Sequence, residues 1–455
     1  MGQLLIKNAE AIVTCDGKDN VFYHCDILAD GQRITAIGPD LSAPGAEVLD
    51  AKGCYVYPGL INTHHHLLQA FSRNIPCIQN SELFDWLMYL YQVWVQVDPE
   101  YIYYSSAVAM SEFVKFGGTT MFDQHFAFPR SSSKEIIDRQ FDAAAELGVR
   151  FHAGRSCFTR GKSTGGLPPD ELVESCGEML EDCRRLVEKY HDGNEFSMRQ
   201  VALAPCSPFS VDSETMLESA RLARQLGVRL HTHLCETIDE EDYCLQVYGK
   251  RPLAWAEECE FVGSDVWYAH GIHFTDEEVA FLAKTKTGVS HNPVSNMKLA
   301  SGVCKVPLML ELGVPVGLAV DGSGSNDASN LLADLRSCFL LHRLISSKKA
   351  PTAYQVLKLA TQGSAELLGR TDLGSLAVGK AADLFLVNMD GLKDVGATLD
   401  PGSYLCTVGS GMMADATVVG GRVVWKNGRL TGIDEDVMKK EARKVVQKVY
   451  ENLPV

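Results

Sequence analysis

The stretch LGVRLHTH at residues 226–233 contains the pattern that decides the fold. A helical segment ends at Gly227, and an apolar strand follows at once and ends in two histidines. The same order of helix end, glycine and strand occurs at residues 116–123, 147–152, 287–291 and 312–321. Glycine suits this junction because it accepts the left-handed conformation in which many helices end. Helices alternating with parallel strands over about 310 residues indicate a (β/α)₈ barrel or a doubly wound sheet.

Polar residues at the ends of these strands separate the two architectures. The predicted strands end at Asp123, His152, His291 and Asp321, and a further one at the pair His231 and His233. In a barrel the carboxyl ends of many strands meet at one site. A doubly wound sheet has a single switch point and usually a Gly-x-Gly-x-x-Gly loop, which does not follow the first strand here. The sequence therefore favours the barrel.

The residue pattern at both ends of the chain is typical of a β-sheet. Short apolar runs punctuated by glycine occupy residues 4–6, 11–13, 26–28 and 33–37, and similar runs occupy 383–387, 416–419 and 422–425. Such runs between turn residues are typical of antiparallel strands. A charged amphipathic helix is predicted after Ile433, running to about Tyr450.

Composition excludes several classes of partner. Hydrophobic residues make up 46% of the chain and charged residues 22%, and the net charge is −16, from 42 basic and 58 acidic residues. An acidic chain is not expected to bind nucleic acid or an anionic membrane. No apolar run reaches the roughly 18 residues of a membrane helix, and no signal peptide is evident. The 14 scattered cysteines are expected to be buried thiols in a cytoplasmic protein.

Histidines after two of the strands predict a metal site. His64 and His66 lie two residues apart on an extended segment, so their side chains point the same way. His233 ends another strand, and Asp321 ends the last one. Three imidazoles and one carboxylate suit Zn²⁺ or Fe²⁺ and do not suit Ca²⁺ or Mg²⁺. We expect one divalent ion, with Zn²⁺ preferred and Fe²⁺ as the alternative.

Two further residues are expected to take part in catalysis. Glu236 lies three residues beyond His233, where it can carry a proton between water and a leaving group. A solvated surface acid is the other interpretation, since four acidic residues follow at 239–242. His270 ends the predicted sixth strand and can orient a water or Asp321. The isolated His24, His191, His273 and His342 receive no role.

These motifs together resemble the amidohydrolase superfamily. The matching segments are PGLINTHHH at 58–66, HLCE at 233–236, His270, HNP at 291–293 with Ser295-Asn296, DGS at 321–323 and GSLAVGKAADL at 374–384. The resemblance implies a distorted (β/α)₈ TIM barrel at 58–372, a small discontinuous β-sandwich from 1–57 and 373–430, and a C-terminal helix at 433–452. Strand four ends at APCSP, residues 204–208, without the lysine that bridges two metals, which implies a single ion.

Within that superfamily the chain is similar to aminohydrolases of nitrogen heterocycles. The resemblance implies a metal-dependent deaminase in which activated water attacks an amino-bearing ring carbon and ammonia leaves. The expected substrate is 8-oxoguanine or a related guanine, isocytosine or pterin ring, which would place the enzyme in purine metabolism. The alternative is an amino- or chlorohydrolase of triazines. A ring-opening cyclic amidohydrolase and an inert metal-binding protein are less favoured, because the lysine is absent and the expected site is intact.

Recognition of the ring is assigned to three residues. Gln69 can donate and accept hydrogen bonds along the edge of a heterocycle. His125 and Arg155, after the second and third strands, are expected to face a carbonyl oxygen; the competing interpretations are a place on the surface or contact with the residues that surround the site rather than with substrate. An aromatic segment at 84–94 can stack on a planar ring, or it can belong to the core or to a subunit interface of a homo-oligomer.

Overall fold

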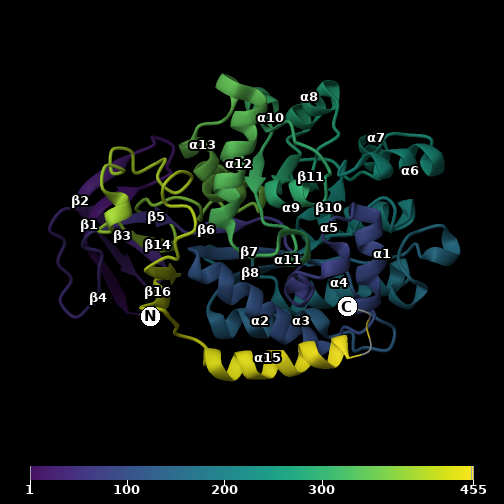
Figure 1. The fold of residues 1–455 in the computed structure, drawn as a ribbon, viewed down its shortest axis with the longest axis horizontal. Coiled ribbons are helices and arrows are strands. Elements are labelled where there is room, and N and C mark those ends of the chain that lie inside the picture. The colour runs from purple at the N-terminus through teal and green to yellow at the C-terminus, as the bar shows by residue number, and fades with distance from the viewer. Residues whose placement is uncertain (1, 452, 454–455) are drawn as a thin grey trace.

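The computed structural model describes residues 2–451 and 453, and within them two sheets organise the chain. One is an eight-stranded parallel sheet curled into a nearly closed barrel, and the other is a mixed sheet built from both chain ends (Figure 1). The predicted architecture of a (β/α)₈ barrel with a separate β-unit from the termini is therefore confirmed. The exact domain boundaries at 57/58 and 372/373 stay a prediction.

The barrel strands follow one another in chain order around the sheet, each parallel to its neighbour. They are β6 (Leu60–Asn62), β7 (Gly118–His125), β8 (Arg150–Arg155), β9 (Arg199–Leu203), β10 (Leu230–Leu234), β11 (Val266–His270), β12 (Gly288–His291) and β13 (Val316–Leu318).

Side chains close the seam between the first and last barrel strands. The Val320 N–H donates to Asn62 Oδ1 at 2.9 Å, and Thr63 Oγ1 donates to Leu318 O at 3.2 Å. The backbone N–H of Asp321 also donates to His64 O at 3.2 Å. These bonds bring the two most distant ligand-bearing segments, 60–66 and 316–321, side by side.

Helices alternate with the barrel strands and cover their outer face (Figure 1). The helices that precede or cover the strands are α1 (Leu83–Trp94), α2 (Pro99–Lys115), α3 (Ile136–Leu147), α4 (Cys176–Tyr190), α5 (Ser213–Leu226), α6 (Ile238–Tyr248), α7 (Pro252–Glu258), α8 (Asp276–Thr285), α9 (Pro293–Lys298), α10 (Val306–Leu312), α11 (Ser323–Asn326), α12 (Leu331–Ser346), α13 (Ala353–Lys358) and α14 (Ser364–Leu367). Short 3-10 turns such as η1 (Leu67–Phe71) connect some of them.

The predicted glycine helix ends are present at four junctions and differ at one. Gly148, Gly227 and Gly313 follow α3, α5 and α10 with φ between 70° and 77°, and Gly117 follows the end of α2 with φ 83°. After α8, however, Lys286 takes the left-handed conformation, with φ 59°. Gly288 is needed for a different reason, because a Cβ there would lie 2.3 Å from Leu367 Cδ2. The glycine admits close packing of the barrel strand against α14.

Two strand ends also differ from the prediction. Strand β7 continues to His125 and β8 to Arg155, so Asp123 and His152 lie inside their strands. Asp123 accepts hydrogen bonds from the Leu67 N–H at 2.5 Å and from Gln140 at 2.7 Å, and so fixes the segment after His66. His152 accepts from Arg370 at 3.1 Å, away from the other strand-end residues. No sequence signal marked these longer strands, because every residue of β7 and β8 is buried and the strands therefore show no alternation of buried and exposed positions.

The mixed sheet alternates strands from the two ends of the chain. Its order is β17-β16-β15-β14-β5-β1-β2-β3, with β4 paired to β1. The predicted runs 4–6 and 11–13 form one long strand whose register shifts between Ile6 and Ala9. The strands are β1 (Gln3–Val13), β2 (Val21–Asp30), β3 (Arg33–Gly38), β4 (Glu47–Asp50), β5 (Cys54–Pro58), β14 (Leu384–Asn388), β15 (Ala416–Val419), β16 (Arg422–Lys426) and β17 (Arg429–Leu430).

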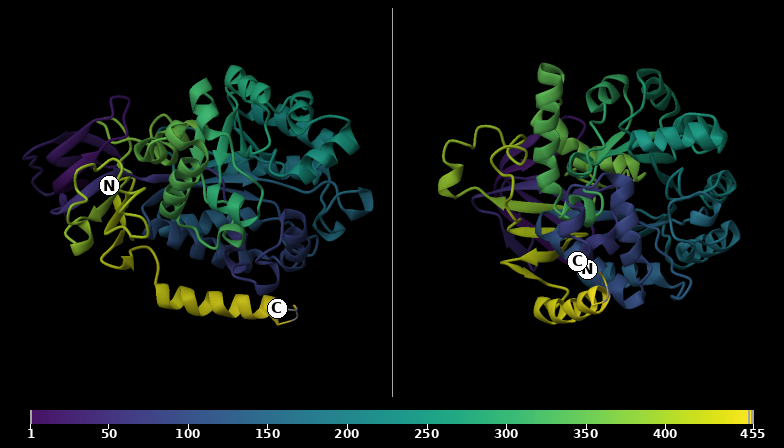
Figure 2. Two further views of the ribbon diagram at one scale, coloured as in Figure 1. Left: turned by 45° about the horizontal axis from the view of Figure 1, so that its top comes forward. Right: turned by 45° about the vertical axis from the view of Figure 1, so that its right-hand side comes forward.

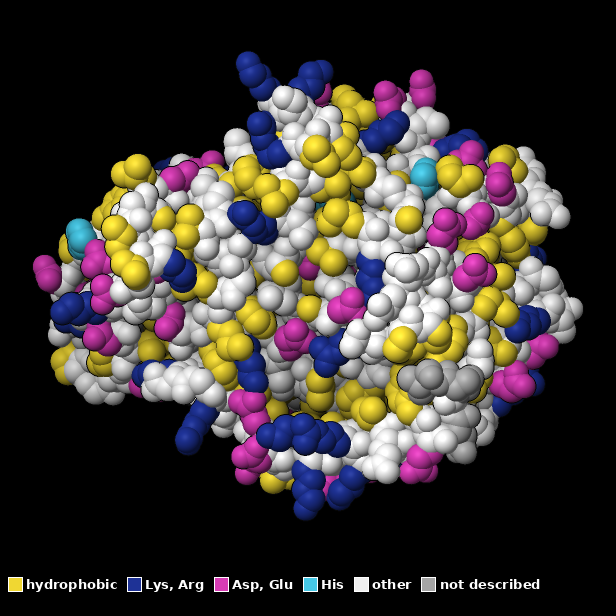
Figure 3. Space-filling model, viewed as in Figure 1, with side chains coloured by type: hydrophobic (Ala, Val, Ile, Leu, Met, Phe, Trp, Pro, Cys, Tyr) yellow, Lys and Arg dark blue, Asp and Glu magenta, His cyan; other side chains and the backbone are white. Residues whose placement is uncertain are grey.

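The C-terminal helix lies along the outside of the barrel, as both views in Figure 2 show. The helix predicted at 433–452 is α15 (Glu435–Tyr450), and Asn452 lies outside the described residues. Tyr450 donates to Phe71 O at 2.7 Å, and Lys115 pairs with Glu435. Among the described residues no helix is long and apolar enough to cross a bilayer. Acidic and basic side chains are interspersed on the face shown in Figure 3.

Candidate metal centre and active site

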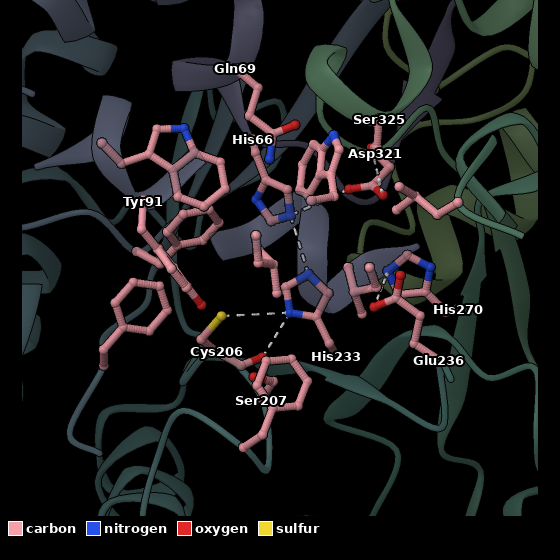
Figure 4. Close-up of a pocket in the computed structure, with 18 residues that line it drawn as sticks. His66, Gln69, Tyr91, Cys206, Ser207, His233, Glu236, His270, Asp321 and Ser325 are labelled. Atoms are coloured by element: carbon pink, nitrogen blue, oxygen red, sulfur yellow. Dashed lines mark hydrogen bonds and ion pairs between the residues drawn. The ribbon is translucent and has the colours of Figure 1, made fainter. Parts of the chain in front are cut away.

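A pocket opens at the carboxyl ends of the barrel strands, and the predicted polar residues gather there (Figure 4). Its polar lining consists of His66, Gln69, Cys206, Ser207, His233, Glu236, His270, Asp321 and Ser325. His64 lies behind this lining and is fully buried. These residues come from five barrel strands or the loops that follow them, so the barrel brings together side chains up to 261 residues apart, from His64 to Ser325.

Four side chains converge on one point. His64 Nε2 lies 3.2 Å from Asp321 Oδ1, and His66 Nε2 lies 3.3 Å from the same oxygen. His66 Nε2 lies 3.2 Å from His233 Nε2. Ligand atoms placed at two corners of a tetrahedron around Zn²⁺, about 2.0–2.1 Å from the ion, are separated by about 3.3 Å. The spacing of these donors therefore matches a tetrahedral ion.

The far nitrogen of each imidazole is already bound. His66 Nδ1 donates to Gln124 O at 2.8 Å, and His233 Nδ1 donates to Cys206 O at 2.7 Å. Because a ring nitrogen that donates to a carbonyl carries the proton, Nε2 of each ring keeps its lone pair facing the centre. Burial lowers the pKa of His66, and lowers that of His233 to about 3, so both rings stay neutral.

His64 is oriented by a second histidine. His231 Nδ1 donates to Trp267 O at 2.9 Å, which leaves His231 Nε2 as an acceptor. His64 Nδ1 donates to that nitrogen at 2.8 Å. His64 Nε2 is thus a buried lone pair that has no hydrogen-bond partner among the described residues. An orphaned nitrogen beside three other donors fits a bound cation, and the donor set of three imidazoles and one carboxylate fits a divalent transition-metal ion.

Asp321 is held by several donors and a strained backbone. Its Oδ2 accepts from Ser295 at 2.6 Å and from Ser325 at 3.1 Å, and its Oδ1 accepts from the Gly322 N–H at 2.7 Å. Burial opposes its ionisation, but hydrogen bonding and the surrounding imidazoles of His64, His270 and His66 outweigh burial and hold the pKa of Asp321 well below its usual range. Asp321 has φ 65°, a conformation that non-glycine residues rarely adopt and that clusters at functional sites.

Glu236 is buried beside this cluster. The side chain of Glu240 accepts from the backbone N–H groups of Cys235 and Glu236, at 2.7 and 3.2 Å, and so fixes the loop that presents Glu236. Burial, and next the charge of Asp321, raise the pKa of Glu236 well above its ordinary value. The interpretation of Glu236 as a solvated surface acid is therefore wrong, and the residue is poised to carry a proton at neutral pH.

His270 lies between Glu236 and the loop after β12. Its Nε2 is 3.5 Å from Glu236 Oε2, and its Nδ1 donates to Asn296 Oδ1 at 2.8 Å. With the proton on Nδ1, the Nε2 lone pair faces Glu236 and the pocket. His270 has φ 72°, so it shares with Asp321 the left-handed conformation at the end of its strand. In Figure 4 Glu236 and His270 lie on one side of the imidazole pair and Tyr91 on the other.

Apolar and aromatic side chains form the rest of the wall. They are Leu83, Trp86, Leu87, Tyr91, Trp94, Phe126, Phe158, Phe209 and Leu299. The predicted aromatic segment therefore forms helix α1 and supplies Trp86, Tyr91 and Trp94 to the pocket. Gln69 also lines the pocket, and its Oε1 accepts from the Gly324 N–H at 3.1 Å. A flat, mostly apolar space with polar groups on one side suits a planar ring.

His125 and Arg155 are not among the residues that line this pocket, so their contact with a substrate carbonyl stays a prediction without support from the geometry. Arg155 is buried in ion pairs with Glu174, at 2.8 Å, and Asp182, at 2.6 Å. His125 Nε2 donates to Ala127 O at 2.9 Å. Both side chains are buried and bound to other groups of the protein, which is one of the alternatives that the sequence left open. A strand-end position alone did not distinguish the interpretations.

Several residues of the site were not assigned from the sequence. His231, Ser295, Asn296 and Glu240 each bind one of the predicted residues. His231 lies two residues before His233 on β10, so the alternation that links His64 to His66 also indicated it. The other three are recognisable only once distant loops are in contact.

Comparison with known proteins gives a consistent result. Residues 55–424 match the model of the amidohydrolase family. A hydroxydechloroatrazine ethylaminohydrolase from Pseudomonas sp. strain ADP is 44% identical, over 98% of this chain and 95% of the relative. An 8-oxoguanine deaminase from Pseudomonas aeruginosa is 41% identical, over 95% of this chain and 96% of the relative.

A solved structure of an atrazine chlorohydrolase from Arthrobacter aurescens TC1, complexed with zinc, has the same fold. The two chains superpose with a TM-score of 0.93 and are 33% identical, over 97% of this chain and 100% of the other. The similarity extends over both the barrel and the sheet from the chain ends.

Proposed function

This chain belongs to the amidohydrolase family, and from that membership we propose that it is a metal-dependent hydrolase that releases ammonia from an aromatic nitrogen heterocycle. One observation supports the proposal most strongly. Three metal-type donors with a fourth, His64, directly behind them, a buried protonatable glutamate and a histidine gather at a single pocket with aromatic walls.

His64, His66, His233 and Asp321 are the proposed ligands of one divalent ion. Such an ion, when bound, lowers the pKa of water and so supplies a nucleophile at neutral pH. We propose Zn²⁺ rather than Fe²⁺, because a structure of similar fold was determined with zinc. The proton transfers and the orientation of the water are assigned to side chains of the pocket.

Asp321 is the proposed acceptor of the proton that the attacking water loses. Its Oδ1 lies against His64 and His66, while its Oδ2 is fixed by Ser295 and Ser325. Oxygen bonds to the ring carbon that bears the amino group, and the C=N electron pair moves onto the ring nitrogen.

Glu236 is the proposed donor to that ring nitrogen. Its raised pKa keeps the proton available until negative charge develops on the ring. The proton held by Asp321, or one returned through Glu236, then passes to the amine as the C–N bond breaks. Ammonia leaves, the ring carbon becomes a carbonyl, and one water is consumed.

His270 is the proposed orienting group for the attacking water. Asn296 holds the proton of His270 on Nδ1, so that Nε2 is free to accept a hydrogen bond from water or from Glu236. A fixed acceptor beside the reaction centre aligns the nucleophile with the ring carbon.

8-Oxoguanine or a related purine or pterin ring is the first proposed substrate. A relative named 8-oxoguanine deaminase shares 41% of its residues with this chain over nearly the full length of both. Gln69 presents an amide at the pocket, where it can read the edge of such a ring.

A triazine aminohydrolase is the second candidate. It is favoured by the 44% identity to an enzyme named hydroxydechloroatrazine ethylaminohydrolase, and by the fold of the atrazine chlorohydrolase. The leaving group would then be an alkylamine or chloride, and the roles of Asp321 and Glu236 would be unchanged.

A release screen distinguishes these candidates. The zinc-loaded enzyme is incubated with 8-oxoguanine, guanine, isocytosine, pterins, cytosine, and amino-, alkylamino- and chlorotriazines, and ammonia, alkylamine and chloride are measured. We expect ammonia from an oxopurine or pterin, and none from the Glu236→Gln variant. Release of alkylamine or chloride alone would favour the second candidate, and no release from any ring would overturn the proposal.

A further inference from the structure

A second cluster of metal-type side chains lies outside the pocket. His291 ends strand β12, while Cys338 and His342 lie four residues apart on one face of helix α12. All three are buried, and one donor atom from each lies within 4.8 Å of the other two. None of the three lines the pocket described above.

The two imidazoles of this cluster show the same spacing as the proposed catalytic ligands. His291 Nε2 lies 3.2 Å from His342 Nε2, and His66 Nε2 lies 3.2 Å from His233 Nε2 in the pocket. A direct hydrogen bond between the two rings satisfies Nε2 of His291. Its Nδ1 remains buried without a partner among the described residues, which is costly unless another group binds the ring.

We propose that His291, Cys338 and His342 bind a second metal ion, distinct from the ion of the active site. Two imidazoles and a thiolate favour a borderline or soft cation such as Zn²⁺ and disfavour Ca²⁺ and Mg²⁺. Binding requires that the Cys338 thiol release its proton to solvent as the sulfur–metal bond forms, with no change of oxidation state.

The expected role of this ion is structural. It would join helix α12 to the end of β12, close to the point where the Val294 N–H of α9 donates to Asp334 of α12 at 3.4 Å. The residue after His291 is Asn292, whose side chain contacts His270 at 3.3 Å. The ion would therefore stabilise the loop that supports His270 without touching the substrate.

Cobalt spectroscopy distinguishes the two sites, because only the second one has a sulfur among its proposed ligands. The full-length protein is produced with Co²⁺ as the only added transition metal, and bound cobalt and thiolate-to-cobalt charge-transfer absorption are measured. We expect about two ions per chain and a charge-transfer band, against about one ion and no band if only the active site is filled.

Variants identify the thiolate. Cys338→Ser should lose the band and one of the two ions, and His342→Ala should lose one ion. Cys304→Ser is the matched control, since Cys304 is a buried thiol that contacts Gly271 O and Met309 outside the cluster. It should keep both the band and the ions.

A wild-type protein that binds about one cobalt per chain without the band would overturn the proposal, as would a band that persists in Cys338→Ser. The wild-type spectrum decides the question even if a variant fails to fold. Because the band depends on sulfur, its presence or absence is also independent of whether the proposed deaminase activity is found.

Discussion

At the scale of single residues, the proposed metal centre depends on what binds the outer nitrogen of each imidazole. The sequence predicted His64, His66, His233 and Asp321 from two rules, the alternation of side chains along a strand and the convergence of strand ends in a barrel. It did not predict Ser295 or Asn296 as partners of Asp321 and His270, because those contacts join loops that only the folded chain brings together. The buried partners of His125 and Arg155 could not be predicted for the same reason.

Replacement of Glu236 tests its role as proton carrier. Glu236→Gln keeps the size of the side chain but removes the transferable proton, so kcat should fall by about 10²–10⁴-fold. Metal content should not change, because Glu236 is not among the four clustered donors. Steady-state kinetics together with metal analysis check this expectation, and a variant with the kcat of the wild type would refute the assignment.

Replacement of His231 tests the orientation of His64. His231→Ala removes the acceptor of the His64 Nδ1 proton, so metal affinity should fall by about 10–100-fold, as is typical when an outer partner of a ligand is lost. Competition with a chelator measures the affinity. His231→Gln offers a side-chain oxygen in place of the ring nitrogen and should restore part of the metal affinity. His24→Ala, at a highly exposed histidine, is the control and should leave the affinity unchanged. Equal affinity in His231→Ala and the wild type would show that the bond is not needed.

Asp372 should make stability depend on pH. Burial alone would raise its pKa, but hydrogen bonds from Arg370 outweigh burial and lower the pKa from 3.8 to about 2. A carboxyl with a depressed pKa stabilises the fold above its unfolded-state value, and the contribution is lost as the pH falls toward the folded-state value. The melting temperature of Asp372→Asn should therefore be below that of the wild type at pH 7, and the gap should narrow as the pH falls from 3.8 toward 2. A gap that is constant or that widens on acidification would contradict the expected ionisation.

At the scale of elements, the hydrophobic pattern and the positions of glycine predicted most of the strands. The lengths of the strands were harder to predict from the sequence. The junctions at Gly148, Gly227 and Gly313 are left-handed helix ends, as the sequence indicated. The junction after α8 uses Lys286 instead, and lysine carries no sequence signal for that conformation. Strands β7 and β8 extend two to three residues beyond their predicted ends, because a strand buried on both faces shows no alternation at its boundary.

Gly227 offers a clean test of a helix end. A Cβ at this position meets nothing within 4 Å, so Gly227→Ala introduces only backbone strain at φ 70°. We expect a loss of stability of about 1 kcal/mol, seen as a lower melting temperature. Gly177 in helix α4 is the matched control, since its Cβ also meets nothing and its φ is not positive. Gly177→Ala should be neutral or stabilising, and an equal loss in both variants would contradict the explanation.

At the scale of the whole molecule, the barrel and the sheet from the chain ends are joined by a buried ion pair. Arg150 opens strand β8, and its Nε and Nη2 donate to Asp383 at 2.6 and 3.0 Å, immediately before β14. The Gly420 N–H also donates to Asp383 at 2.6 Å. The two-part architecture was predictable from the strand pattern at both chain ends and from the family motifs. The ion pair could not be predicted, because its two residues are 233 positions apart in the sequence.

Removing one partner of the Arg150–Asp383 pair should destabilise the fold more than replacing both partners. Asp383→Asn leaves the Arg150 guanidinium buried without its counter-charge and should cost about 3–5 kcal/mol, whereas Arg150→Met with Asp383→Asn should cost less. Chemical denaturation compares the variants. Any folded variant should retain its kcat, because the pair does not line the pocket. A double variant less stable than Asp383→Asn alone would contradict the role given to the unpaired charge.

Three imidazoles and one aspartate, from the ends of two barrel strands and the segment after β6, are proposed to hold one catalytic ion. Anomalous diffraction at the zinc absorption edge, from crystals of the zinc-loaded protein, is the decisive measurement. We expect a strong peak about 2.0–2.2 Å from His64 Nε2, His66 Nε2, His233 Nε2 and a carboxylate oxygen of Asp321. Full zinc occupancy elsewhere with no peak among these four side chains would contradict it.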